Sequence, residues 1–118
     1  MRKSTNPEII TIIRFLKKKS TETEASIWKT VANKLKKSKH ARSTVNLSRI
    51  NRCTKDGAKV MVPGKVLGAG DLEHKISIAA FSFSKKARRK VEKIGGECLN
   101  IKEFVQKYPK GSGVNIIG

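Results

Sequence analysis

The sequence predicts a mixed α/β protein in which two N-terminal helices precede short strands interleaved with two further helices. Apolar residues recur at helical spacing in two blocks before residue 38, and they form short runs, partly alternating, after residue 45. Glycine and proline separate those later runs. A length of 118 residues fits one domain. We therefore expect one domain over residues 1–118, with a basic helical part at 1–44 and a mixed α/β core at 45–118.

The first helix is predicted to begin at Asn6-Pro7-Glu8, because asparagine is a good N-cap, proline suits the first helical position and an acid suits the first turn. Its apolar face extends from Ile9 to Leu16. The run Lys17-Lys18-Lys19 marks its end after about ten residues, since cations favour the C-terminal end of the helix dipole. The second helix is predicted from about Glu24 to Lys37. Its buried stripe consists of Ala25, Trp28, Val31, Ala32 and Leu35.

The pattern after residue 39 is that of strands and turns. Val45, Leu47 and the polar residues around them predict a short strand or an extended arm, and Asp56-Gly57 predicts a turn. Further strands are predicted at residues 59–62, 65–67 and 75–83, separated by Pro63-Gly64, Gly68 and Gly70-Asp71.

A third helix is predicted to follow Ser84 as its N-cap, with Ala87, Val91 and Ile94 facing inward and Gly95-Gly96 ending it. The remaining predicted elements are a strand at 98–99, a short helix at 101–108 closed by Pro109, and a last strand at 114–117.

The composition is strongly basic, with 27 Lys and Arg against 9 Asp and Glu and a net charge of +18. Self-repulsion of this size destabilises a compact state, so the excess predicts a polyanionic partner. Aromatic residues make up 5% of the chain, too few to stack single-stranded bases one by one. The composition therefore favours folded nucleic acid, above all RNA. The alternative is a highly charged domain that has no such partner.

Residues 25–55 contain nine Lys and Arg and no acid, whereas a solvated helix face usually mixes both signs. This stretch is predicted to lie against nucleic acid, and the extended segment from Lys39 to Thr44 is predicted to approach the backbone. Together with the basic N-terminus, it supplies these candidate RNA-binding residues: Arg2, Lys3, Lys34, Lys36, Lys37, Lys39, His40, Arg42 and Arg52.

The third predicted helix carries Lys85 and Lys86 in its first turn, where cations oppose the positive end of the helix dipole. Two ammonium groups beside the exposed N–H groups of a helix start form a phosphate site. Arg88 and Arg89 extend this basic face, and all four residues are candidates for RNA binding. The alternative is a Lys and Arg face that is only solvated.

The sequence matches no catalytic, nucleotide-binding or metal-binding motif. The run from Gly64 to Gly70 lacks the Gly-Lys-Ser/Thr of a P-loop, and no helix follows it as a dinucleotide motif requires. His40 and His74 have no nucleophile or paired carboxylate with them. Cys53, His74 and Cys98 have no metal-ligand spacing and no fourth ligand. We expect no enzymatic activity, no cofactor, no bound metal and no small-molecule substrate.

The cysteines are expected to be reduced thiols, as in a cytosolic protein. No apolar run is long enough to span a membrane. Binding of a basic amphipathic helix to a membrane surface is a weaker alternative, because the apolar faces have strands to pack on.

Several motifs occur in one order that closely resembles a known family. They are VNLSRI at 45–50, VPGKVLG at 62–68, IAAFSFS at 78–84 and GGE at 95–97. The family is large-subunit ribosomal protein eighteen of the archaeal and eukaryotic type, whose superfamily includes bacterial large-subunit ribosomal protein fifteen. The resemblance covers nearly the whole chain, whose length is similar to that of the short archaeal form.

This resemblance implies an irregular arrangement of β-β-α units preceded by helices. It also implies a structural, non-enzymatic constituent of the large ribosomal subunit in the cytoplasm, which supports translation. Its partners would be large-subunit ribosomal RNA and neighbouring large-subunit proteins. The matching motifs add Asn46, Ser48, Arg49 and Lys65 to the candidate RNA-binding residues.

Two other classes of function compete with this one. A free regulator or architectural protein would bind duplex DNA as well as it binds ribosomal RNA. An enzyme that modifies or cleaves RNA would depend on His40 and His74.

Overall fold

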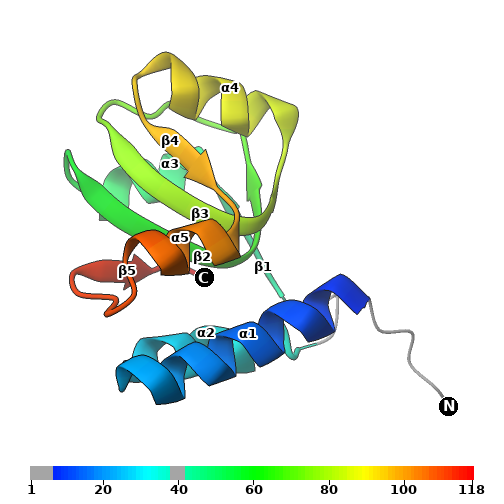
Figure 1. Cartoon of the computed structure of the whole chain (residues 1–118). Helices are drawn as coiled ribbons and strands as arrows, with labels where there is room; N and C mark the ends of the chain where they lie inside the picture. The colour runs from blue at the N-terminus through cyan, green and yellow to red at the C-terminus, as the bar shows by residue number, and fades with distance from the viewer. Residues whose placement is uncertain (1–6, 38–41) are drawn as a thin grey trace, which may run out of the picture.

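A parallel β-sheet forms the centre of the computed structural model, which describes residues 7–37 and 42–118 (Figure 1). The strands in this part of the chain are β1 (Ser43–Asn46), β2 (Ala58–Leu67), β3 (Ile76–Phe83), β4 (Glu97–Leu99) and β5 (Val114–Ile116). Their order is β1-β2-β3-β4, and every pairing is parallel. Strand β5 pairs with residues 59–61 of β2 and β1 pairs with residues 64–67, so both share the edge of β2 that faces away from β3.

Helices cover both faces of this sheet, as parallel sheets require. On one face lie α3 (Leu47–Cys53) and α4 (Lys85–Lys93), which bury Leu47, Ile50, Ala87 and Val91 against the sheet. On the other face lie α1 (Pro7–Thr23), α2 (Ser26–Leu35) and α5 (Ile101–Lys107). Figure 1 shows α1 and α2 side by side below the sheet and α4 above it.

Trp28 is the largest fully buried side chain, and it joins the helices of the second face. Its ring meets that of Phe104 in α5 edge to face, with 6.3 Å between the ring centroids. Its indole Nε1 donates to the carbonyl of Pro109 at 2.7 Å. The N-terminal helices are therefore packed against the C-terminal part of the chain.

The predicted fold class is confirmed, but the first two helices have different bounds. Helix α1 continues to Thr23, so the lysines at 17–19 lie inside it rather than at its end. Lysine has good helix propensity, and packing against α2 extends the helix beyond its apolar run. Helix α1 ends at Thr23, the next residue Glu24 has a φ of 58° at the turn between the helices, and α2 is shorter than predicted. The predicted N-cap Asn6 lies outside the described residues.

The prediction of a strand or extended arm that includes Leu47 was wrong beyond Asn46, because residues 47–53 form helix α3. Leu47 fits an alternating pattern with Val45, but it also lies three residues before Ile50, and burial of both side chains decides for the helix. The prediction that Pro63-Gly64 separates two strands was also wrong. These residues lie inside β2, where the register with β3 shifts between Val62 and Lys65.

The later elements follow the prediction closely. The hydroxyl of Ser84 caps α4 by accepting from the N–H of Ala87 at 3.1 Å. Gly95 follows the helix with a φ of 87°, a conformation that favours glycine. The strand at Cys98-Leu99, the helix α5 and the strand β5 are present as well, each within a residue or so of the predicted bounds.

Candidate nucleic-acid interface

The carboxyl ends of β1, β2 and β3 meet at one edge of the sheet, because the strands are parallel. Helix α3 begins directly after β1, and α4 begins one residue after β3. Both helix starts therefore lie at this edge, with the connection that follows β2 between them. The edge of parallel strands that carries such connections is where α/β folds bind ligands.

Asn46 and Ser48, two of the predicted RNA-binding residues, hold the connection after β2. The Asn46 side-chain oxygen accepts from the N–H of Ala69 at 3.2 Å, and the N–H of Ser48 donates to the Ala69 carbonyl at 3.0 Å. A Cβ on Gly70 would lie 2.4 Å from the Ser48 Cβ, so these two segments of the chain are in close contact. These contacts give both residues a structural role, and a contact of either one with RNA stays a prediction.

Lys90 of α4 fixes the same connection from the other side. Its ammonium group donates to the carbonyls of Gly68 at 2.9 Å and Gly70 at 2.6 Å, and it lies 3.6 Å from a carboxylate oxygen of Asp71. This lysine is occupied by protein acceptors. It supports the edge rather than presenting a charge to a partner.

A basic surface covers the outer side of α3 and α4. We call it the α3–α4 surface, and it consists of the exposed side chains of Arg49, Arg52, Lys85, Lys86, Arg88 and Arg89. Arg88 lies 4.0 Å from Glu92 and over the ring of Phe83 at 5.2 Å. The other five form no ion pair with any residue in the described part of the chain. All six were predicted as RNA-binding residues, and the fold brings them to one face.

A second basic surface lies on the hairpin of α1 and α2. We call it the hairpin surface, and it consists of Lys17, Lys29 and Lys36, all exposed. The charge of Lys36, above all, lowers the pKa of Lys17, and the charge of Lys29 adds to the effect. Like charges this close disfavour the charged form. A bound anion would relieve the repulsion.

Lys17 was missed as a candidate because the sequence assigns it to the end of α1. The signal that could have found it is the hairpin itself: two antiparallel helices joined by a short turn place Lys17 opposite the end of α2. Lys37, which was predicted, is exposed next to Lys36. Lys34, also predicted, points elsewhere, because its ammonium group donates to the carbonyl of Gly118 at 3.2 Å.

Arg42 and Lys65 belong to neither surface. Arg42 precedes β1, and its guanidinium group lies over the ring of Phe81 at 5.9 Å. Lys65 is exposed on β2, where it pairs in register with Thr44 and Ser82. The predicted residues Arg2, Lys3, Lys39 and His40 lie outside the described residues.

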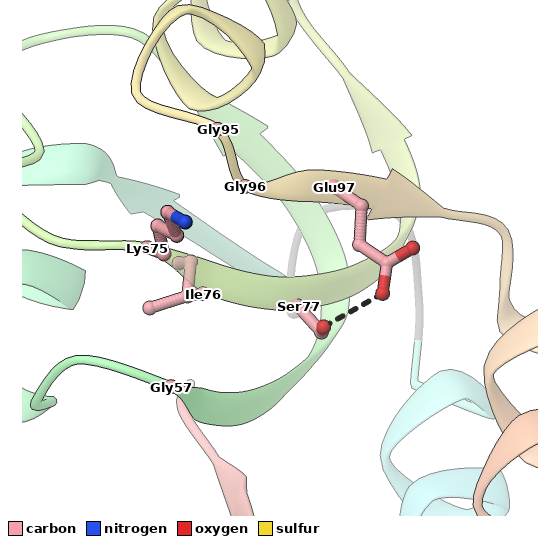
Figure 2. A pocket seen from close by; sticks show the side chains of 7 residues that line it. All are labelled: Gly57, Lys75, Ile76, Ser77, Gly95, Gly96 and Glu97. Carbon is pink, nitrogen blue, oxygen red and sulfur yellow. Dashed lines mark hydrogen bonds between the residues drawn. The ribbon is translucent and has the colours of Figure 1, made fainter.

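A shallow pocket of about 250 Å³ lies at the opposite, amino edge of the strands (Figure 2). Its polar side chains are Lys75, Ser77 and Glu97. Figure 2 shows the hydrogen bond from Ser77 to Glu97, 2.8 Å long, and Lys107 donates to the same carboxylate oxygen. Lys107 above all, and then Ser77, keep the pKa of Glu97 below its usual range. A carboxylate held ionised in this way is a poor proton donor.

The cysteines and histidine in the described part form no metal site. No group of three or more His, Cys, Asp or Glu residues there could hold a metal ion. Both cysteines are free, and burial raises the pKa of Cys98 to about 11, which keeps it a thiol. Within residues 7–37 and 42–118, no helix has both the length and the apolar character needed to cross a membrane.

A three-layer α/β fold with basic surfaces on both helix layers defines the class: a small basic α/β protein. A family model described as "Ribosomal protein 60S L18 and 50S L18e" matches residues 1–118. The large ribosomal subunit protein eL18 of Methanothermobacter thermautotrophicus is 46% identical over 113 residues, which cover 96% of this chain and 93% of that protein. The protein of the same name from Archaeoglobus fulgidus is 44% identical over 117 residues, or 99% of both chains.

The chain therefore belongs to the family of ribosomal proteins L18 and L18e. The resemblance inferred from the ordered sequence motifs is confirmed. The members of this family are ribosomal proteins and not enzymes, which agrees with the expectation of no catalytic activity.

Proposed function

We propose that the protein is a structural constituent of the large ribosomal subunit that binds large-subunit ribosomal RNA and thereby supports translation in the cytoplasm. The observation that carries the proposal is the set of exposed basic residues on the hairpin and α3–α4 surfaces, all of which except Arg88 have no acidic partner among the described residues. Neighbouring large-subunit ribosomal proteins would be its other partners. Membership of a family of ribosomal proteins supports the same function.

The contacts would be directed mainly at phosphates. Lys and Arg on helix surfaces fit phosphate oxygens, and such contacts position a protein without reading sequence. With about ten phosphate contacts, the logarithm of the affinity would fall with the logarithm of the salt concentration with a slope of roughly −7 to −9. The surfaces are also suited to folded RNA, because side chains reach its backbone across the wide, shallow minor groove.

The test uses the double variant Lys85→Glu, Lys86→Glu and a fragment of large-subunit ribosomal RNA. Acids in the first turn suit the helix dipole, so the variant should fold and gain a few tenths of a kcal/mol per substitution. Its affinity for the RNA should fall, and the salt slope should become smaller by about 2. A matched control is Lys75→Glu, Lys110→Glu, which changes the charge equally at two exposed residues outside both surfaces and outside residues 25–55.

An unchanged affinity in the Lys85 and Lys86 variant would show that the first turn of α4 does not contact the RNA. Equal affinity of the wild-type protein for duplex DNA and for the ribosomal RNA fragment would instead favour a free regulator or architectural protein.

A further inference from the structure

The helices of the second face leave one end of the sheet uncovered. Met61 and Ala79 are fully buried in the cluster that packs under α1, α2 and α5. Further along the same two strands, toward their carboxyl ends, Phe81 is half-buried and Lys65 is exposed. Lys65 points to this face, because its neighbour Val66 is buried under α3 and α4 and successive side chains of a strand alternate. The carboxyl end of this sheet face is therefore open to a ligand.

Arg42 lies at this open end, and its hydrogen-bond donors are unused. Its guanidinium group lies over the ring of Phe81, with 5.9 Å between the guanidinium carbon and the ring centroid. Its Nε is buried without a hydrogen-bond partner, and none of its nitrogens forms an ion pair or hydrogen bond with a described residue. A guanidinium group has five N–H donors, and a buried donor without an acceptor is unfavourable. The cation–π contact thus holds a group whose donors have no acceptor in the described part of the chain.

The sheet fixes the backbone on which this pair stands. Ser43, the residue after Arg42, begins β1 and pairs in register with Gly64 of β2. A Cβ on Gly64 would overlap the carbonyl oxygen of Ser43, so the two backbones are in close contact. Phe81 lies within β3, whose pairing with β2 continues on both sides of it. The sheet therefore positions both the guanidinium group and the ring beneath it.

A guanidinium plane held in this way fits an unpaired base. Unpaired bases of RNA stack on aromatic rings and on the planes of arginine side chains, and a guanidinium group is planar and weakly hydrated. Lys65 and Thr44 pair in register across β2 and β1, and both are exposed. They offer an ammonium group and a hydroxyl to the phosphate and ribose of the same nucleotide.

We infer that Arg42, supported by the ring of Phe81, stacks on one unpaired base of the RNA. In the described part of the chain, Arg88 is the other arginine that lies over a ring, but it lies 4.0 Å from Glu92, whereas Arg42 has no acidic partner there. The inference rests on the proposed function, because it takes RNA as the ligand. It adds a contact that depends on a base rather than on phosphate charge.

The experiment uses three RNA hairpins that share a stem of about 16 base pairs. The first hairpin has a single-stranded tail of adenosines, the second has an abasic tail of the same length, and the third has no tail. Wild-type protein should bind the adenosine tail roughly five- to a hundredfold more tightly than the abasic tail, the range expected for stacking of one base. The two tails carry the same phosphates, so charge cannot cause the difference.

Two variants and a control assign that preference to the site. Arg42→Lys keeps the charge but loses the plane, so it should bind both tails about equally, with the salt dependence of the wild-type protein. Phe81→Leu removes the ring beneath the guanidinium group and should reduce the preference for the adenosine tail. Arg14→Lys, the matched control at an exposed arginine of α1, should keep the full preference. Circular dichroism checks that the variants are folded, and Arg42→Lys alone decides the test if Phe81→Leu is not.

The outcomes separate this inference from the proposed function. Equal affinity of the wild-type protein for the adenosine and abasic tails would overturn the stacking site but leave RNA binding intact. A full preference that persists in folded Arg42→Lys would also overturn it, because the base would then bind elsewhere. Wild-type protein that binds neither the three hairpins nor ribosomal RNA would contradict the proposed function itself.

Discussion

Lysine side chains in this protein have two different roles, and their neighbours decide between them. Lys90 and Lys107 are held by carbonyl or carboxylate oxygens of the protein. Lys36 instead lowers the pKa of Lys17, and neither lysine forms an ion pair with an acid in the described part of the chain. Lysine content alone therefore predicts an anionic partner but does not identify the residues that meet it.

The carboxylate of Glu97 provides a test at the scale of single residues. Lys107 first, and then Ser77, lower the pKa of Glu97, and Glu97 in turn raises the pKa of Lys107. A lowered acid pKa gives stability that is present above the ordinary glutamate value of about 4.3 and is lost as the pH falls through the folded value. A raised lysine pKa gives stability that is present below the ordinary lysine value of about 10.4 and is lost as the pH rises through the folded value.

We therefore expect the variant Glu97→Gln to lose less stability than the wild-type protein between about pH 5 and pH 3. The effect should be small, because solvent screens this exposed pair. Urea midpoints measured across that pH range provide the comparison. Parallel pH profiles for the two proteins would show that the ion pair does not contribute to stability.

At the scale of elements, the sequence predicts best where several local signals agree. Helix α4 has a serine N-cap, an inward face at Ala87 and Val91, and a glycine stop, and its bounds were predicted closely. Helix α3 was missed because Leu47 fits both a strand and a helix pattern, and only its burial against the sheet distinguishes them. The extension of α1 through its lysines likewise depends on packing against α2.

The candidate site was predictable to the extent that charge follows the chain. Lys85 and Lys86 at the start of α4 were identified because cations in a first helical turn are unfavourable without an anion, and Arg88 and Arg89 because they extend the same basic face. The pairing of Lys17 with Lys36 was not, because it arises from the antiparallel packing of two helices. The structural role of Asn46 was hidden for a similar reason, since its partner Ala69 is 23 residues away.

The close contact between Gly68 and the first turn of α4 gives a test at this scale. A Cβ on Gly68 would lie 2.8 Å from the Lys86 Cγ and 2.9 Å from the Ala87 nitrogen, so α4 would have to shift. We expect Gly68→Ala to lower the free energy of unfolding by about 1 to 3 kcal/mol, the usual cost of overpacking. The control Ala69→Gly, at the exposed neighbour, should cost less than about 1 kcal/mol. Chemical denaturation measures both, and equal costs would contradict the proposed packing.

At the scale of the whole molecule, the core extends from the N-terminal helices to the C-terminal strand. Trp28 of α2 is buried with Phe104 of α5, and its indole donates a hydrogen bond to the carbonyl of Pro109. These contacts connect the basic helical part to the α/β core. The division at residue 44 is therefore a division of composition, and we predict that residues 1–118 unfold as one domain.

Trp28 is the sole tryptophan of the chain, so its fluorescence reports on the helical part, while circular dichroism reports on all elements. The two thermal transitions should coincide in the wild-type protein. Trp28→Ala should cost about 3 to 5 kcal/mol and lower the melting temperature of the sheet together with that of the helices. Separate transitions would show that residues 1–44 fold apart from the rest.

The proposed function makes the protein an RNA-binding part of the large ribosomal subunit. Fractionation of ribosomes on a sucrose gradient in high-magnesium buffer, with detection of the native protein in each fraction, shows whether it is one. We expect the protein in the large-subunit and whole-ribosome fractions, with release into the top fractions as the salt concentration rises. A native protein that stays at the top of the gradient in low salt would contradict the claim.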